Sequence, residues 1–217
     1  MIRHRTWLGF LPVLLSVGCA VLPSGQQRVA DGKAALDAMQ ACCVTLSTAA
    51  RVPLPLVKSL VEVDGRSQAF RFDDNKAFFK LFALPEFSRP YSIVLSSLAS
   101  GNPTDMTVLV PRIVMFNANF VKTRQFEDKT LRNRGANLER TVFINSVDSQ
   151  ERYLAVYGFD LSATFEAAYS QVTTQSWTGA GGAYFMTSTG TDGKSVTRVS
   201  PVGQLQIEIQ GLAEAKP

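Results

Sequence analysis

Histidine is almost absent from this sequence of 217 residues: the one histidine is His4, which precedes the first apolar run. A chain that loses this leader therefore has none. That absence excludes a Ser-His-Asp triad, a Cys-His pair and a zinc site with histidine ligands. The carboxylate pairs Asp73-Asp74 and Glu127-Asp128 lie in polar stretches typical of solvated turns, so they do not indicate glycoside hydrolysis.

The remaining motifs for catalysis or cofactor binding are weak. A Ser-Lys dyad is the alternative for a hydrolase, at Lys58-Ser59 or Lys194-Ser195, but neither pair differs from an ordinary polar stretch. Residues 73–75 (Asp-Asp-Asn) offer oxygen ligands for calcium without the spacing of an EF-hand. The glycines at 179–182 lack the Lys-Ser/Thr ending of a phosphate-binding loop. We therefore predict a protein that is not an enzyme, with no catalytic residues, no metal and no cofactor.

Blocks of like charge are also missing. The chain has 22 basic and 18 acidic residues, and the basic ones are spread singly. Removing Arg3 and Arg5, which precede the apolar leader, leaves 20 basic against 18 acidic residues, a net charge of +2. Nucleic-acid binding depends on clustered cations that neutralise phosphates. The sequence thus predicts no nucleic-acid partner.

The first apolar run is too short for a membrane-spanning helix, which needs ~20 apolar residues. It covers residues 7–17, is interrupted by Pro12 and Ser16, and follows Arg3 and Arg5. A short apolar run behind positive charges is typical of a signal peptide. We therefore predict that residues 1–18 form a lipoprotein signal peptide.

The residue that makes this a lipoprotein leader is Cys19, which follows the small residue Gly18 as in a bacterial lipobox. The usual leucine three places before the cysteine is replaced by Ser16, and Leu15 lies one place further back. Cys19 would carry a diacylglycerol thioether, and two or three acyl chains such as palmitate hold a protein stably at a bilayer. Ala20 favours the outer membrane. The alternative is an ordinary cleaved signal peptide, with Cys19 incidental.

Cys42 and Cys43 are the other two cysteines, and they are adjacent. A disulfide between neighbours is strained, so the sequence favours two small apolar side chains packed at the end of a segment. An intermolecular disulfide or a redox switch is the alternative.

After the leader, the chain divides into two parts that differ in composition and in the spacing of apolar residues. Residues 19–50 are predicted to form a tether and a short helix. Proline and glycine among polar residues at 21–28 indicate the tether, and apolar residues recur at helical spacing over 30–45. Residues 51–217 are predicted to form a β-sandwich domain.

Short β-prone runs separated by turn signals fill that domain. Pro111 divides one run into either two strands or an edge strand with a bulge. Residues 161–171 are a candidate second helix, and residues 176–188 are expected to form a long loop. The fold class predicted is all-β, an antiparallel β-sandwich of jelly-roll type with one or two short helices. The clear runs are 67–72, 77–84, 91–98, 107–116, 141–147, 153–159 and 203–210.

Three aromatic residues mark a candidate binding surface. Trp177 is the only tryptophan outside the leader, and Tyr184 and Phe185 follow it closely. Aromatic rings on a loop of a sandwich suit a sugar-stacking platform. The alternative is that the same rings cap the core.

Taken in order, these segments resemble the maltose operon periplasmic protein (MalM) family. The resemblance includes the strand with Phe70 and Phe72 and several further stretches. It implies an envelope protein linked to maltose uptake, with no catalytic residues to carry over. The lipobox-like Cys19 departs from the family and puts a freely diffusing role in doubt. The further stretches are 34–40, 84–98, 108–120, 140–146, 152–160 and 203–210.

Two functions are expected from these features. The first is a lipid-anchored accessory or binding protein on the periplasmic side of the cell envelope, an outer-membrane lipoprotein linked to maltose or maltodextrin uptake. The alternative is a structural or assembly lipoprotein that binds another envelope protein and no sugar. Both place the chain at a membrane through Cys19.

Replacing the acylation site tests this anchor. Cys19→Ser removes the sulfur that takes the lipid, so the variant is expected to lose processing before position 19 and to leave the membrane fraction. Mass spectrometry of the mature N-terminus and cell fractionation measure the two effects. Unchanged processing and fractionation would contradict a lipid anchor at this residue.

Overall fold

The computed structural model describes residues 23–127, 131–158, 163–179 and 181–212. The predicted signal peptide and Cys19 lie outside these residues. Within the described part of the chain, no helix is long and apolar enough to cross a membrane.

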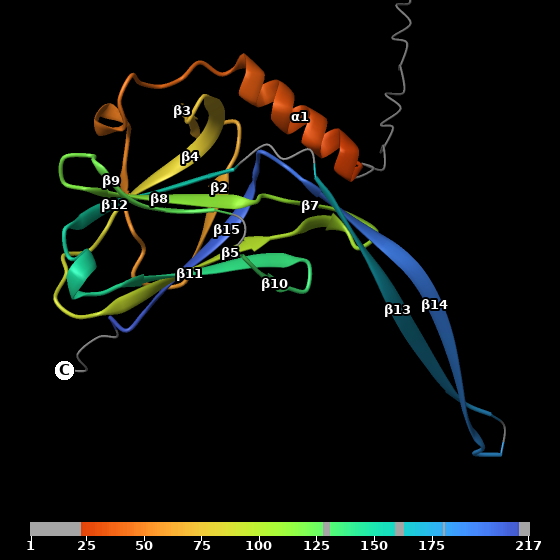
Figure 1. The fold of residues 1–217 in the computed structure, drawn as a ribbon. Coiled ribbons are helices and arrows are strands. Elements are labelled where there is room, and N and C mark those ends of the chain that lie inside the picture. Colours follow the sequence, from red (N-terminus) through yellow and green to blue (C-terminus); the bar gives the residue numbers. More distant parts are fainter. Residues whose placement is uncertain (1–22, 128–130, 159–162, 180, 213–217) are drawn as a thin grey trace, which may run out of the picture.

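The described residues form three sheets, and two of them pack face to face (Figure 1). Sheet A has the order β1-β4-β12-β8-β9, with β3 also pairing β4, and sheet B has the order β10-β11-β5-β15-β2. Most pairs in these two sheets are antiparallel, although β1 pairs β4 in parallel. The predicted all-β sandwich is confirmed. The strands of sheets A and B are β1 Val52–Pro53, β2 Ser59–Val63, β3 Gln68–Phe72, β4 Asn75–Ala83, β5 Tyr91–Leu98, β8 Pro111–Asn117, β9 Lys122–Phe126, β10 Arg132–Arg134, β11 Asn137–Ile144, β12 Glu151–Gly158 and β15 Gly203–Gln210.

The third sheet, sheet C, contains a long hairpin that projects from the sandwich (Figure 1). Its order is β13-β14-β7-β6, with strands β13 Thr164–Thr178, β14 Tyr184–Val199, β7 Asp105–Val108 and β6 Ser100–Asn102. The helix expected at 161–171 is wrong over its described residues, and the loop expected at 176–188 is confined to the turn between Thr178 and Tyr184. The two long strands pair residue by residue from Thr164↔Arg198 to Thr178↔Tyr184, and their many threonine and aromatic residues suit extended backbone.

The N-terminal helix, α1 Gly25–Ala38, begins earlier than the spacing of apolar residues predicts. Ser24 caps it, because the Ser24 hydroxyl accepts a hydrogen bond from the Gln27 amide at 3.1 Å. The tether expected at 21–28 is therefore wrong from the cap onward. Leu36 is buried in the main core, so the helix packs against the sandwich. Two 3₁₀ turns, η1 Leu46–Thr48 and η3 Ser146–Asp148, complete the helical elements of the described residues.

Sheet A is apolar on both faces at its centre. Along β12, Leu154 and Val156 enter the core between sheets A and B, whereas Ala155 and Tyr157 point to the outer face. Successive side chains of a strand alternate between faces, so a continuous apolar run needs cover on both sides. The same alternation occurs in β4 and β8. The outward set is Ala77, Phe79, Leu81, Val114 and Phe116, and the inward set is Phe78, Phe82, Ile113 and Met115.

A buried ion pair, Glu151 with Arg124, joins the edge of sheet A to sheet B. The Glu151 side chain is 1% exposed, and its two oxygens accept hydrogen bonds from Arg124 at 2.6 and 2.9 Å. Thr123 donates a third bond to Glu151 at 2.7 Å. Arg124 also donates to the Phe143 carbonyl of β11 at 3.0 Å. The carboxylate is therefore held by charge-assisted bonds, which are stronger than neutral ones.

Neutralising this carboxylate tests its contribution to stability. Glu151→Gln removes the nearer of the two carboxylates that pair with Arg124, since Asp148 remains at 3.5 Å, so the free energy of unfolding is expected to fall by about 2 kcal/mol. Urea denaturation followed by circular dichroism measures the change. Glu62→Gln, at the exposed pair with Arg66, is the matched control and should leave the midpoint nearly unchanged. An equal effect of both substitutions would contradict the assigned role of Glu151.

Candidate binding cleft

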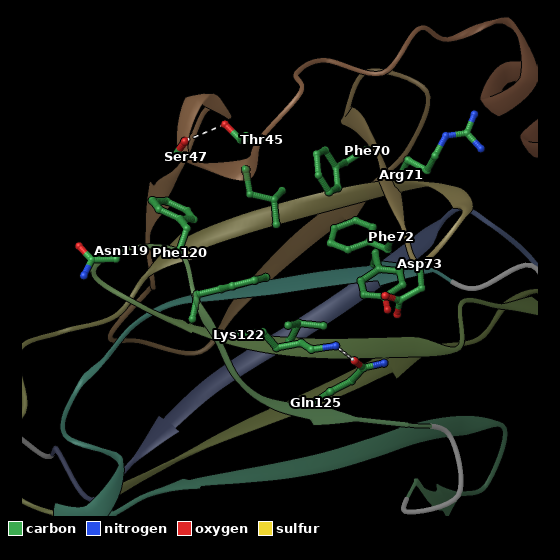
Figure 2. Close-up of a pocket in the computed structure, with 14 residues that line it drawn as sticks. Thr45, Ser47, Phe70, Arg71, Phe72, Asp73, Asn119, Phe120, Lys122 and Gln125 are labelled. Atoms are coloured by element: carbon green, nitrogen blue, oxygen red, sulfur yellow. Dashed lines mark hydrogen bonds between the residues drawn. The ribbon is translucent and has the colours of Figure 1, made fainter.

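The outer face of sheet A carries a cleft, because its cover is incomplete. Leu46 and Ala49, in and after the η1 turn, pack on one part of the face. Beside them a half-open cavity of about 470 Å³ remains (Figure 2). Its size lies in the range of small-molecule pockets, about 300–1,000 Å³. The lining residues are Thr45, Leu46, Ser47, Phe70, Arg71, Phe72, Asp73, Val114, Phe116, Asn119, Phe120, Lys122, Gln125 and Tyr157.

Aromatic rings form the floor of the cleft. Phe72 and Tyr157 stack with ring centres 4.0 Å apart, and Phe70 meets Phe72 edge-on at 5.0 Å. Burial raises the pKa of the Tyr157 hydroxyl, an effect that the neighbouring Arg112 partly opposes. Tyr157 is thus neutral at physiological pH. Phe70 is half-buried, so its ring is open to a ligand in the cleft.

The turn between β8 and β9 places Phe120 at the cleft in an unusual conformation. Phe120 has φ +58°, in the left-handed region that bulky side chains rarely adopt. The Asn117 side chain holds the turn, because its carbonyl oxygen accepts hydrogen bonds from the amides of Asn119 and Val121 at 2.9 and 3.0 Å. The Phe120 ring stacks on Tyr153 at 4.3 Å. Backbone strain of this kind clusters at binding and active sites.

A second strained turn lies at another side of the cleft. Asp73 and Asp74 connect β3 to β4 with φ of +41° and +67°, as a two-residue hairpin turn requires. The Asn75 side chain donates to the Asp73 carbonyl at 3.2 Å, and Arg71 donates to the Asp74 carbonyl at 3.0 Å. In the part of the chain that the structure describes, no cluster of acidic, cysteine or histidine residues suits a metal ion. The register pair Phe72↔Asn75 places Asp73 and Asp74 in the turn.

The rim of the cleft is polar and carries both signs of charge. Lys122 donates to the Gln125 side chain at 2.9 Å, and the hydroxyls of Thr45 and Ser47 share a bond of 2.8 Å. Figure 2 shows Asn119 directed away from the aromatic rings. An aromatic floor beneath hydroxyl, amide and amine groups can bind a neutral ligand with an apolar face and hydroxyl-bearing edges.

The adjacent cysteines lie just before the segment that covers sheet A. The structure joins Cys42 to Cys43 by a disulfide. The prediction of two unpaired apolar side chains is therefore wrong. Cys42 is exposed, and its amide donates to the Ala69 carbonyl of β3 at 2.8 Å. Cys43 packs at the margin of the outer cluster. Both cysteines lie in an irregular loop. No long strand or helix separates the two side chains there, so the loop permits this pairing.

The aromatic residues predicted from the sequence lie far from this cleft, at the end of the β13–β14 hairpin (Figure 1). Trp177 and Phe185 are register partners that stack with ring centres 6.0 Å apart. Tyr184 pairs with Thr178, one position further along, and so faces the opposite side of the hairpin. The three rings therefore do not form one continuous platform.

The cleft itself was not predicted from the sequence. Its signal is a set of apolar residues, several of them aromatic, at alternate positions of β3, β4, β8 and β12. Recognising the cleft from that signal requires knowing that these strands are neighbours in one sheet and that its outer face is partly bare.

Comparisons with known proteins give no match. No family model matches the chain, and neither a curated protein nor a solved structure matches it.

Proposed function

We propose that this chain is a lipid-anchored accessory or binding protein on the periplasmic side of a bacterial envelope, and that the cleft on sheet A is its ligand site. The observation that carries the proposal is the aromatic, half-open cleft with its polar rim. The leader and Cys19 support the anchor. The resemblance to the maltose operon periplasmic protein family makes maltodextrin the candidate ligand.

The chemistry of the cleft suits a sugar chain. A glucose ring has a face of C–H groups, which packs on an aromatic ring, and edges of hydroxyls, which bond to side chains such as Ser47, Gln125 and Lys122. A chain with no histidine after the leader also fits binding without catalysis.

Phe120 provides the sharpest test of this site. Phe120→Asn removes the ring but keeps a residue that tolerates positive φ. The lost stacking on Tyr153, about 1 kcal/mol, is offset by about the same amount of released backbone strain, so stability should hardly change. Affinity for maltodextrin, measured by titration calorimetry, is expected to fall about tenfold with the loss of one ring contact.

Val121→Ala in the same turn is the matched control, because Val121 is exposed and does not line the cleft. It should bind as the unchanged protein does. Trp177 fluorescence should not respond to sugar, since Trp177 lies at the hairpin end. No heat at millimolar maltodextrin would refute the sugar ligand, and a Trp177 response instead would favour the platform at the hairpin.

A second candidate function is assembly with another envelope protein. It is favoured by the exposed apolar side chains of Leu56, Val57 and Leu60 beside β2, the edge strand of sheet B. An edge strand with apolar neighbours is a typical site for a protein partner.

A photo-crosslinking residue at Leu60 tests this second function in cells. One dominant crosslinked product is expected if the β2 edge is an interface. The same residue at Arg132, an exposed position of β10 at the other edge of sheet B, is the control. Monomer alone at both positions would contradict an assembly role for this edge.

A further inference from the structure

The end of the β13–β14 hairpin is apolar and exposed. Trp177, Tyr184, Phe185 and Met186 are 50%, 65%, 48% and 63% exposed. We call these four residues the hairpin tip. Large apolar side chains in such a group expose more apolar surface than the scattered single residues of an ordinary protein surface. The exposure of the hairpin tip therefore indicates that it contacts an apolar partner.

The apolar side chains surround the tip on both faces of the hairpin. Trp177 and Phe185 share one face, and Tyr184 and Met186 occupy the other, as the register of the two strands requires. A protein surface would cover one face of a narrow hairpin. A medium into which the tip is immersed would contact both.

The chain near the tip carries no charge. From Ala167 to Thr191 the sequence has no Asp, Glu, Lys or Arg, although 18% of the whole chain is charged. Burying a charged side chain in lipid costs several kcal/mol, whereas serine, threonine and glutamine can bond to headgroups and water. The connecting turn is also uncharged, with Gly181 and Gly182 at φ +91° and +80°.

The base of the hairpin is fixed to the sandwich, so the tip is held out at a distance. Arg198 of β14 contacts Asp105 of β7 at 3.2 Å, and Asp105 also accepts the Gly25 amide of α1 at 2.6 Å. Ser195 donates to the Pro103 carbonyl at 2.7 Å. Beyond this base, the residues from 167 to 178 extend about 40 Å at about 3.3 Å per residue. Figure 1 shows the hairpin leaving the body of the molecule.

We propose that the hairpin tip inserts into the interfacial region of a lipid bilayer, with electrically neutral headgroups sufficient for binding. Tryptophan and tyrosine are the residues enriched at that depth, because each combines an apolar ring with one polar group. This contact is additional to the predicted acyl anchor and is independent of the ligand in the cleft. Pairing of the free β13 edge with a second copy is the rival explanation of the same exposed hairpin.

Trp177 reports the insertion directly, since it is the one tryptophan left when the leader is removed. The processed full chain, reconstituted in phosphatidylcholine vesicles, is expected to show a blue-shifted Trp177 emission compared with the chain in detergent-free buffer. Brominated acyl chains should quench the emission, and acrylamide should lose access. Added salt should change none of these effects, because no charge takes part.

Two variants separate insertion from a general change of fold. Phe185→Ser reduces the apolar tip and should return the emission and the acrylamide access toward their values in buffer. Val172→Ser, at an exposed position in the stem of the same hairpin, is the control and should retain the quenching by brominated lipid. Emission identical in buffer and vesicles would overturn the proposal. A blue shift that appears without lipid and grows with protein concentration would overturn it in favour of self-association.

Discussion

The central constraint in this fold is that sheet A is apolar on both faces. A strand that alternates apolar with polar residues needs one packed neighbour, but β4, β8 and β12 place large side chains on both sides. Sheet B, with Leu36 of α1, covers the inner face. The outer face depends on a segment of the N-terminal region, with Leu46 and Ala49 as its buried contacts. The position and the character of the cleft both follow from this partial cover.

The strained turns belong to the same arrangement. Among the described residues, positive φ outside glycine occurs at Asp73, Asp74 and Phe120, and the first and last of these line the cleft. Each turn closes a hairpin of sheet A at the margin of the bare face. The Asn117 side chain and the Phe120–Tyr153 stack provide the contacts that keep Phe120 in its conformation. A site whose geometry is held by hydrogen bonds and ring packing is largely preformed for its ligand.

Sheet A and the β13–β14 hairpin place their apolar side chains in opposite ways. In sheet A they are buried on both faces, and a cleft remains where cover is missing. In β13 and β14 the exposed large apolar side chains gather at the end, with Phe165 and Val172 as single exposed residues along the stem. The first arrangement suits a small ligand, and the second suits contact with a lipid surface. A protein tethered to a membrane would combine both, with the ligand site on a different part of the molecule from the tip.

Strand alternation made several elements predictable from the sequence. The alternation of Tyr91, Ile93 and Leu95 with serines and small residues predicts β5 with its observed bounds, and Leu205, Ile207 and Ile209 do the same for β15. Pro111, which cannot donate to a sheet ladder, marks the break between β7 and β8.

Other elements depend on partners that are distant in the sequence. The residues of β13 resemble a helix locally, because Ala167 and Ala168 favour one, and only their pairing with β14 fixes them as a strand. The cleft is hidden from the sequence for the same reason, since its floor combines residues of β3, β8 and β12. The positive φ of Phe120 cannot be predicted from its residue type, because a bulky side chain disfavours positive φ.

The most direct test of the account is a map of ligand contacts by nuclear magnetic resonance. Amide chemical shifts of the isotope-labelled protein would be followed while maltodextrin is added. The account predicts that the shifts gather in the two turns at Asp73-Asp74 and 117–121 and in the covering segment at 45–47, with the hairpin end unchanged. Shifts confined to residues 177–186, or no shift at any residue, would contradict a ligand site on the outer face of sheet A.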